Sequence, residues 1–365
     1  MKHWFKRNQL YILLLVFAVA AGVGAYYYIN HALENRVPPV GVNDKEEDEL
    51  SDAVNSPSKN KEEQPSEVNS LRCPLDGEVV SSLPQDRPLA VMIGNSPVAR
   101  PVYGVADADL VYEALVEGGI TRLMAVYYHG QSARIGSIRS ARPYFISLAQ
   151  DTGAVYVHVG ESPQAQTFFK KYGIDHLNEM PITRGFWRVN DRVPPHNLFS
   201  STENLHQLAK DFNMDEEMEV GGFEFEKEIP AASEDFRKSE EIIIYYPEKY
   251  SQVKYAYQSD TDDYLRYMGG KAYIDGSKNS QLRAKNIIIQ YVNTKVMDGE
   301  GRLAVDVMGE GKILVFKNSI AYEGKWSKSG LEEPTKYYDI NGEEMKFSPG
   351  QIWIQIVPSD TRIDY

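Results

Sequence analysis

The sequence predicts an α+β fold, in which a mixed α/β domain is followed by a mostly antiparallel β domain. Over residues 71–220, short apolar runs alternate with amphipathic helix signals, a pattern typical of a mixed sheet with helices. Residues 221–365 instead hold many strand-like runs separated by turn signals such as Asp-Gly and Asn-Gly, which favours antiparallel pairing. A membrane anchor helix over residues 1–30 and a disordered acidic linker over residues 31–70 are predicted to precede both domains.

The predicted anchor is the apolar run from Leu10 to Ile29, which holds 20 residues and no charged side chain. At about 1.5 Å per residue this run spans about 30 Å, the thickness of the hydrocarbon core of a bilayer. Lys2, Lys6 and Arg7 precede the run, and basic residues stay on the cytoplasmic side of a membrane. We therefore expect a single-pass protein of the cell membrane with a cytoplasmic N-terminus and extracytoplasmic domains.

Two other interpretations of this run stay open. Ala18-Val19-Ala20 is a small-x-small site at which a signal peptide is cleaved, and a long buried core helix is the second alternative. The run nevertheless stays apolar up to Ile29, which is longer than the apolar part of a usual signal peptide. Tyr26, Tyr27 and Tyr28 also lie where an outer aromatic belt is expected, which favours the anchor.

The linker is predicted from its charge and its lack of large apolar residues. Residues 34–70 contain ten acidic and four basic side chains. Such a segment cannot bury enough apolar surface to offset the entropy lost on ordering. A flexible coil of this length has a root-mean-square span of about 30–35 Å, so the domains should stand away from the membrane.

Composition excludes some classes of partner. The chain has 39 basic and 52 acidic residues, and its net charge of −13 argues against nucleic acid, whose phosphates need clustered Lys and Arg. The single cysteine, Cys73, forbids an intramolecular disulfide and lies too far beyond the apolar run to carry a lipid. It is interpreted as a free thiol, with an intermolecular disulfide as the alternative. An exported chain without internal disulfides suggests a bacterial protein.

Individual elements follow from local signals. Leu89–Ile93 is a short apolar run next to a proline and predicts a buried strand. Ser162 followed by Pro163 predicts a helix with a serine cap and proline at its first position, and Ser201 begins a similar helix. The further predicted strands are 110–112, 123–128, 154–159, 242–246, 254–257, 287–292, 303–307, 313–316 and 352–357, and the predicted helices are 140–150, 162–171 and 201–212.

Polar residues gather in the first predicted domain and indicate a binding site. Asn95 closely follows the strand Leu89–Ile93, and α/β sheets commonly bind ligands at the ends of strands. Arg139 and Arg142 lie three apart, so both would point to one side if they begin a helix, and guanidinium groups there bind anions. The alternative is that these arginines pair with Glu113, Glu117 or Asp109 and hold the domain together. The predicted ligand-binding residues are Asn95, Glu113, Arg122, Arg139, Arg142 and Asn197.

Three residues are candidates for catalysis, namely His158, His196 and Glu117. His158 ends a predicted strand, and His196 follows two prolines. A histidine taken singly at such a position is more often structural. A histidine beside a glutamate, however, can support general acid–base chemistry. The sequence fixes no nucleophile and contains no Gly-x-Ser-x-Gly elbow or Gly-rich phosphate loop. Two histidines without a third ligand at usable spacing do not predict zinc. We therefore predict no metal and no cofactor.

Several segments resemble the YerB-like family of bacterial lipoproteins, which is defined by a domain of unknown function. The matching segments are 87–93, 108–113, 116–122, 139–143, 195–198, 324–326 and 349–353. The resemblance covers about residues 71–360 and implies an envelope protein of Gram-positive-type bacteria with two domains, the second mostly β. It implies no reaction. Lipoprotein members carry a lipid-modified cysteine at the end of the signal segment; here none lies there, so we expect a protein anchor instead.

Three functions are compatible with these observations. The first is a non-catalytic module, tethered to the membrane, that binds cell-wall glycan or a wall-remodelling protein through a polar cleft. The second is a hydrolase or transferase acting on an envelope polymer, with His158 or His196 as base, Glu117 as acid, and Arg139 and Arg142 holding an anionic group. The third is a structural protein whose polar residues form an internal salt-bridge network. We consider the first most consistent with the sequence, and enzymatic activity is left undecided.

Overall fold

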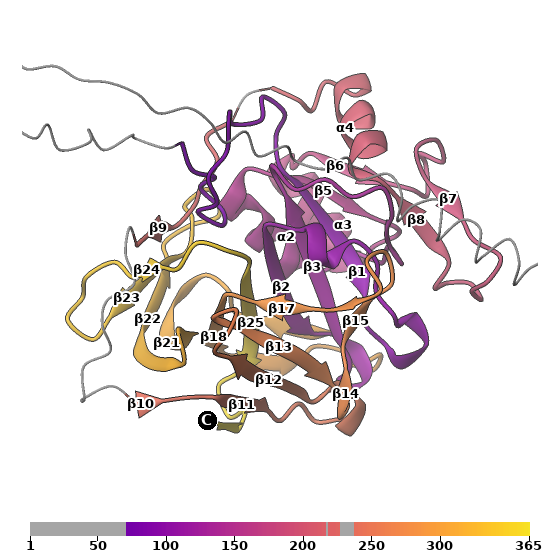
Figure 1. The fold of residues 1–365 in the computed structure, drawn as a ribbon. Coiled ribbons are helices and arrows are strands. Elements are labelled where there is room, and N and C mark those ends of the chain that lie inside the picture. The colour runs from indigo at the N-terminus through magenta and orange to yellow at the C-terminus, as the bar shows by residue number, and fades with distance from the viewer. Residues whose placement is uncertain (1–70, 217, 227–236) are drawn as a thin grey trace, which may run out of the picture. The chain divides into compact units, whose positions relative to one another are not determined.

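The computed structural model describes residues 71–365 except 217 and 227–236 (Figure 1). The predicted anchor and acidic linker lie outside the described residues. Within the described part of the chain, no helix is both long enough and apolar enough to cross a bilayer. All described residues belong to one compact unit.

A mixed sheet of eleven strands forms the centre of this unit and takes strands from both halves of the chain. Ten of its strands form one path, and β23 (Lys336–Asp339) pairs with β22 beside it. The order along the path is β10 (Arg237–Lys238), β22 (Ile320–Lys328), β21 (Gly309–Lys317), β18 (Asn286–Val292), β25 (Ile352–Pro358), β2 (Leu110–Leu115), β3 (Thr121–Tyr127), β1 (Leu89–Gly94), β5 (Val155–His158) and β6 (His176–Asn178).

Strand β25 joins the two halves of the chain within this sheet. It pairs in parallel with β18 over Asn286–Val292 and, on its other side, with β2 over Leu110–Ala114. The last long strand of the sequence is therefore inserted beside a strand from the first half. The two halves consequently share one set of backbone hydrogen bonds (Figure 1).

A second sheet of six strands lies against one face of the main sheet (Figure 1). Its strands are β14 (Lys271–Ala272), β13 (Asp263–Met268), β12 (Val253–Gln258), β11 (Glu241–Ile244) and β26 (Ile363–Asp364), with β17 (Arg283–Ala284) paired to β13. The smaller sheets are β4 (Ile135–Gly136) with β8 (Leu198–Ser200) and β7 (Trp187–Arg188), β15 (Ile274–Asp275) with β16 (Ser280–Gln281), β19 (Thr294–Val296) with β20 (Leu303–Val305), and β24 (Lys346–Phe347) with β9 (Glu224–Phe225).

Three α-helices occur in the described residues, namely α2 (Pro143–Ala149), α3 (Pro163–Tyr172) and α4 (Thr202–Asp211). The predicted serine caps are present on two of them. Ser162 Oγ accepts a hydrogen bond from the backbone N–H of Ala165 at 3.2 Å, and Ser201 Oγ accepts one from Asn204 at the same distance. Each cap satisfies one of the amides that have no partner in the first turn of a helix.

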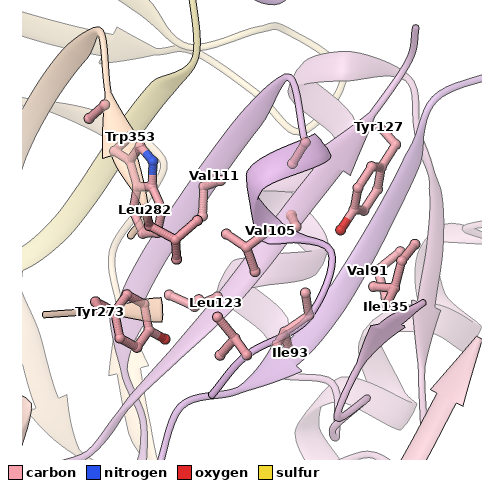
Figure 2. Close-up of a cluster of buried hydrophobic side chains, with 14 of the residues drawn as sticks. Val91, Ile93, Val105, Val111, Leu123, Tyr127, Ile135, Tyr273, Leu282 and Trp353 are labelled. Atoms are coloured by element: carbon pink, nitrogen blue, oxygen red, sulfur yellow. The ribbon is translucent and has the colours of Figure 1, made fainter. Parts of the chain in front are cut away.

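The main sheet is buried on both faces, as strand β1 shows. Val91 belongs to an apolar cluster that also contains Tyr255 of the second sheet, and Figure 2 shows Val91 in this cluster together with Trp353 of β25. The next residue, Met92, points to the opposite face and packs in a cluster with Phe145 of α2. Successive side chains of a strand alternate between faces, so a strand covered on both sides is apolar throughout.

The prediction of an α+β fold is wrong, because the described part of the protein is mostly β: about 40% of the described residues are in strands and 15% in helices. The predicted strands and helices listed above are confirmed at β1, β2, β3, β5, β11, β12, β18, β20, β21, β25, α2, α3 and α4. The error came from strands that the sequence did not reveal. β13, β22 and β23 mix charged residues, tyrosine and glycine, and they are held in place by pairing with distant strands.

Candidate functional site: an arginine cluster

The segment from Ile138 to Arg142 runs between the carboxyl ends of two parallel neighbours, β1 and β5. The backbone N–H of Arg139 donates to Met92 O of β1 at 2.9 Å, and its carbonyl accepts from Val159 N, just after β5, at 3.2 Å. This segment is therefore fixed by backbone hydrogen bonds on both sides. The carboxyl ends of parallel strands are where sheets of this kind place ligand groups.

Three guanidinium groups meet at this segment, from Arg122, Arg139 and Arg142, which we call the arginine cluster. Arg122 lies on β3 opposite Gly94 and donates to the carbonyl of Ser140 at 2.6 Å. Gly94 leaves room for the cluster, because a Cβ there would lie 2.7 Å from Cγ of Arg139. The cluster thus combines one strand residue with two residues of the neighbouring segment.

Only one carboxylate balances this charge among the described residues. Arg142 donates from Nε and Nη2 to the two carboxylate oxygens of Glu117, at 2.7 and 2.8 Å. Arg139 donates from Nη1 to the carbonyl of Pro195 at 2.9 Å, and no ion pair of the described residues involves Arg122 or Arg139. The cluster therefore carries an excess of positive charge.

The surroundings make this excess charge costly. Arg122 is 5% exposed, and burial, reinforced by the charges of Arg142 and Arg139, lowers its pKa to about 10. Burial and Arg142 also lower the pKa of Arg139. A buried charge without a counter-charge is unfavourable, and a bound phosphate or carboxylate would remove that penalty while accepting the remaining guanidinium hydrogens.

Glu117 is held as a carboxylate in this arrangement. Burial opposes its ionisation, but the hydrogen bonds and charge of Arg142, helped by Arg122, outweigh that effect and lower its pKa. Both oxygens are occupied by one guanidinium. Glu117 is thus suited to fixing Arg142 and unsuited to donating a proton as a general acid.

His196 lies at the edge of the cluster, and Asn197 does not enter it. Burial, together with the positive charges of Arg139 and Arg192, lowers the pKa of His196, which keeps its ring neutral at pH 7. The Asn197 side chain instead donates to Val189 O and accepts from Arg188 Nη1, both at 3.2 Å. It therefore stabilises the turn between β7 and β8.

His158 is fully buried and both of its ring nitrogens have partners. Nδ1 lies 2.8 Å from Gly160 O, which makes it the donor, so Nε2 accepts from Nδ1 of His176 at 2.9 Å. The ring also stacks on Phe169. Burial lowers the pKa of His158 to about 3. This histidine has no free nitrogen with which to take a proton from a substrate.

Asn95 and Glu113 belong to a separate buried network, on the face of the sheet opposite Arg122. Glu113 Oε2 lies 2.5 Å from Nη2 of Arg266 on β13, and its Oε1 accepts from Thr121 Oγ1 at 2.5 Å and from Asn95 Nδ2 at 3.1 Å. Tyr273 donates to Asn95 Oδ1. Glu113 and Arg266 are both 0% exposed, so this network ties β2 to the second sheet and leaves no access for a ligand.

Arg266 could not be recognised from the sequence, because its partner Glu113 lies 153 residues away. Its sequence neighbours, Leu265 and Tyr267, are partly exposed, and no local signal marks Arg266 as buried. The tryptophans Trp326 and Trp353 are 2% and 0% exposed and belong to the core. A cavity of about 1070 Å³ borders Trp326 and shares no lining residue with the arginine cluster.

Fold and site together describe a β-rich protein with an arginine cluster at the carboxyl ends of two parallel strands, and comparison with known proteins shows its family. Residues 75–215 match the N-terminal domain, and residues 242–354 the C-terminal domain, of a protein family of unknown function, DUF3048. The chain belongs to this family, which confirms the resemblance noted from the sequence.

One curated relative and one solved structure match strongly. The chain is 30% identical over 301 residues to the Bacillus subtilis (strain 168) protein named "Putative lipoprotein YerB", covering 80% of this chain and 88% of the relative. The crystal structure of YerB from Bacillus subtilis matches with a TM-score of 0.72 at 28% identity, over 81% of this chain and all of that one.

Proposed function

We propose that this chain is an extracytoplasmic envelope module that binds an anionic cell-wall polymer through its arginine cluster. Residues 10–29 would hold it in the membrane as a single-pass anchor with a cytoplasmic N-terminus. The lipoprotein name of its relative supports an envelope location. The basic run at the N-terminus supports the orientation.

The observation that carries the proposal is the charge imbalance between β1 and β5. Among the described residues, the three arginines have one carboxylate partner, that of Glu117, and the least exposed of them, Arg122, donates to a backbone carbonyl and to no carboxylate. The whole chain has a net charge of −13, so this positive site does not reflect a generally basic protein. It is a local arrangement suited to phosphate or carboxylate groups.

Binding without catalysis is the better-supported form of this activity. Two of the three predicted acid–base groups are already engaged, because both ring nitrogens of His158 are occupied by Gly160 and His176 and both oxygens of Glu117 are held by Arg142, which supports binding over catalysis. A fully internal salt-bridge network describes Glu113 and Asn95, but it does not account for Arg122 and Arg139. We therefore favour a binding module over a hydrolase or transferase.

Retention on insoluble peptidoglycan tests the proposal. The full chain in detergent is incubated with wall material that carries its anionic polymers and with the same material stripped of them. We expect retention on the first and a loss of at least about tenfold with Arg139→Ala, which removes a charge-assisted contact worth about 1.5–3 kcal/mol. Arg139→Ala keeps the backbone hydrogen bonds of residue 139, so the fold should survive.

A matched variant separates a built site from general attraction. Arg184→Ala removes the same charge from an exposed arginine that pairs with Asp211, far along the sequence from the cluster. It should leave retention unchanged. Equal losses in both variants would mean non-specific charge attraction. No retention of the native chain would overturn the proposal and turn attention to a wall-remodelling protein as partner.

A further inference from the structure

Four side chains that are able to ligate a metal converge near the start of the described chain, from Cys73, Asp76, Asp109 and His129. Cys73 Sγ, a carboxylate oxygen of Asp76 and a ring nitrogen of His129 all lie within 4.8 Å of one another. Nε2 of His129 is 2.8 Å from Asp76 Oδ2 and 2.9 Å from Asp109 Oδ1. We call these four residues the Cys–His–Asp cluster.

A tight turn places the first two residues. The backbone N–H of Gly77 donates to the carbonyl of Cys73 at 2.9 Å, and Gly77 has a φ of 71°, which glycine adopts without strain. Leu75 N–H points at Cys73 Sγ at 3.4 Å. Glu78 N–H donates to Asp76 Oδ1 at 3.1 Å, which leaves Oδ2 directed at His129.

The ends of two paired strands place the other two residues. Asp109 directly precedes β2 and His129 lies two residues after β3, its antiparallel partner. Asp109 Oδ2 accepts the backbone N–H of His129 at 3.1 Å, and Oδ1 accepts that of Gly130 at 3.1 Å. A Cβ at residue 130 would lie 2.0 Å from the carbonyl of Asp107, so only glycine allows this approach. Backbone groups therefore hold both carboxylates in position.

The cluster contains more hydrogen-bond acceptors than the single imidazole of His129 can satisfy. One ring nitrogen faces two carboxylate oxygens, and the thiol sulfur lies beside them. Cys73, Asp76 and Asp109 are 0%, 4% and 2% exposed, whereas the His129 side chain is 29% exposed and leaves a path from solvent. Buried acceptors that converge on one point and carry an excess of negative charge are the arrangement that a bound cation satisfies.

We propose that the Cys–His–Asp cluster binds a zinc-like divalent cation through Cys73 Sγ, His129 Nε2 and a carboxylate oxygen of Asp76. Sulfur with nitrogen selects zinc-like metals, since calcium and magnesium prefer oxygen ligands alone. Tetrahedral ligands lie roughly 3.3–3.8 Å apart, and the ligand atoms of Cys73, Asp76 and His129 already lie within 4.8 Å of one another, so small shifts of these side chains suffice. The three ligands fasten residues 73–76 to the segment after β3, and Asp109, whose Oδ1 lies 2.9 Å from His129 Nε2, adds negative charge beside them.

The sequence pointed away from a metal because it offered no third histidine at a usable spacing. The cluster needs only one histidine and draws its other ligands from a segment distant in the sequence. It shares no residue with the arginine cluster, so its test does not depend on the function proposed above.

Cobalt binding tests the site directly, because Co²⁺ reports both tetrahedral geometry and thiolate ligation by absorption. The full chain in detergent, stripped with a chelator, is titrated with Co²⁺ and then with Zn²⁺. We expect one equivalent of Co²⁺, a thiolate-to-cobalt charge-transfer band, displacement by Zn²⁺, and a higher melting temperature with Zn²⁺. Cys73→Ser should abolish the band, and His129→Gln should weaken Zn²⁺ binding by more than about tenfold.

His206→Gln is the matched control, because His206 Nδ1 also faces a carboxylate, that of Asp86 at 3.9 Å, without a thiol. It should bind both metals like the native chain. Melting of every variant without metal shows whether it folds. The proposal is overturned if the folded native chain binds neither Co²⁺ nor Zn²⁺, or if folded Cys73→Ser gives the same cobalt spectrum.

Discussion

The buried pair of Glu113 and Arg266 offers the sharpest test of how the two halves are held together. Both side chains are 0% exposed, and Glu113 also accepts hydrogen bonds from Thr121 and Asn95. Arg266→Met keeps a similar side-chain volume but leaves the Glu113 carboxylate without its cation, and Glu113→Gln leaves the Arg266 guanidinium without its anion. Removing one partner of such a pair costs about 3–5 kcal/mol, because an uncompensated charge is left buried.

The double variant decides whether the charge itself is responsible. In Glu113→Gln/Arg266→Met neither charge remains, and the amide oxygen of glutamine still accepts from Thr121 and Asn95. We expect the double variant to be more stable than Arg266→Met, with a coupling free energy of about 2 kcal/mol or more. Urea unfolding followed by tryptophan fluorescence measures it, since Arg266 lies over Trp353 at 4.3 Å. Additive losses, or single losses below about 1 kcal/mol, would refute the reasoning.

Three further predictions concern single residues. The pKa of His158 is about 3 in the folded chain, below its unfolded value of about 6.5, so the unfolded chain takes up a proton first as the pH falls. The free energy of unfolding should therefore decrease by about 2 kcal/mol from about pH 7 to about pH 5. An NMR titration that shows His158 protonated near pH 6 would contradict this. Ser162→Ala should cost about 1 kcal/mol in urea unfolding through the lost cap of α3, and an unchanged midpoint would argue against the cap. Glu117→Gln should lower the free energy of unfolding by about 1–2 kcal/mol but leave retention on peptidoglycan intact, because it releases Arg142 to bind the ligand. Lost retention in the folded variant would mean that Glu117 itself contacts the ligand.

Much of the secondary structure could be predicted because its causes are local. The strand at Leu89–Ile93 is an uninterrupted apolar run, and the helices after Ser162 and Ser201 begin with residues that cap a first turn. The fold class could not be predicted in the same way, because β13, β22 and β23 are held in place by pairing with distant strands. The insertion of β25 between β18 and β2 was equally hidden, because the pairing of Leu110 with Ile352, 242 positions apart, leaves no trace in either segment.

The candidate site was predicted in part, for a related reason. Arg139 and Arg142 are close in sequence, and Arg122 joins them because β3 is paired next to β1. Glu113 looked like a site residue because the sequence cannot show which face of β2 meets Arg266. Burial depends on what covers a residue, and that cover comes from elsewhere in the chain.

The sequence by itself determined the positions of the main strands and helices, the family, and the net charge that argues against nucleic acid. The tertiary structure alone decided that Glu113 is buried against Arg266, that Arg122 donates to a backbone carbonyl, and that Cys73 lies beside His129. Local propensity and hydrophobic pattern act over a few residues, whereas ion pairing, burial and metal ligation depend on side chains that only folding brings within a few ångströms.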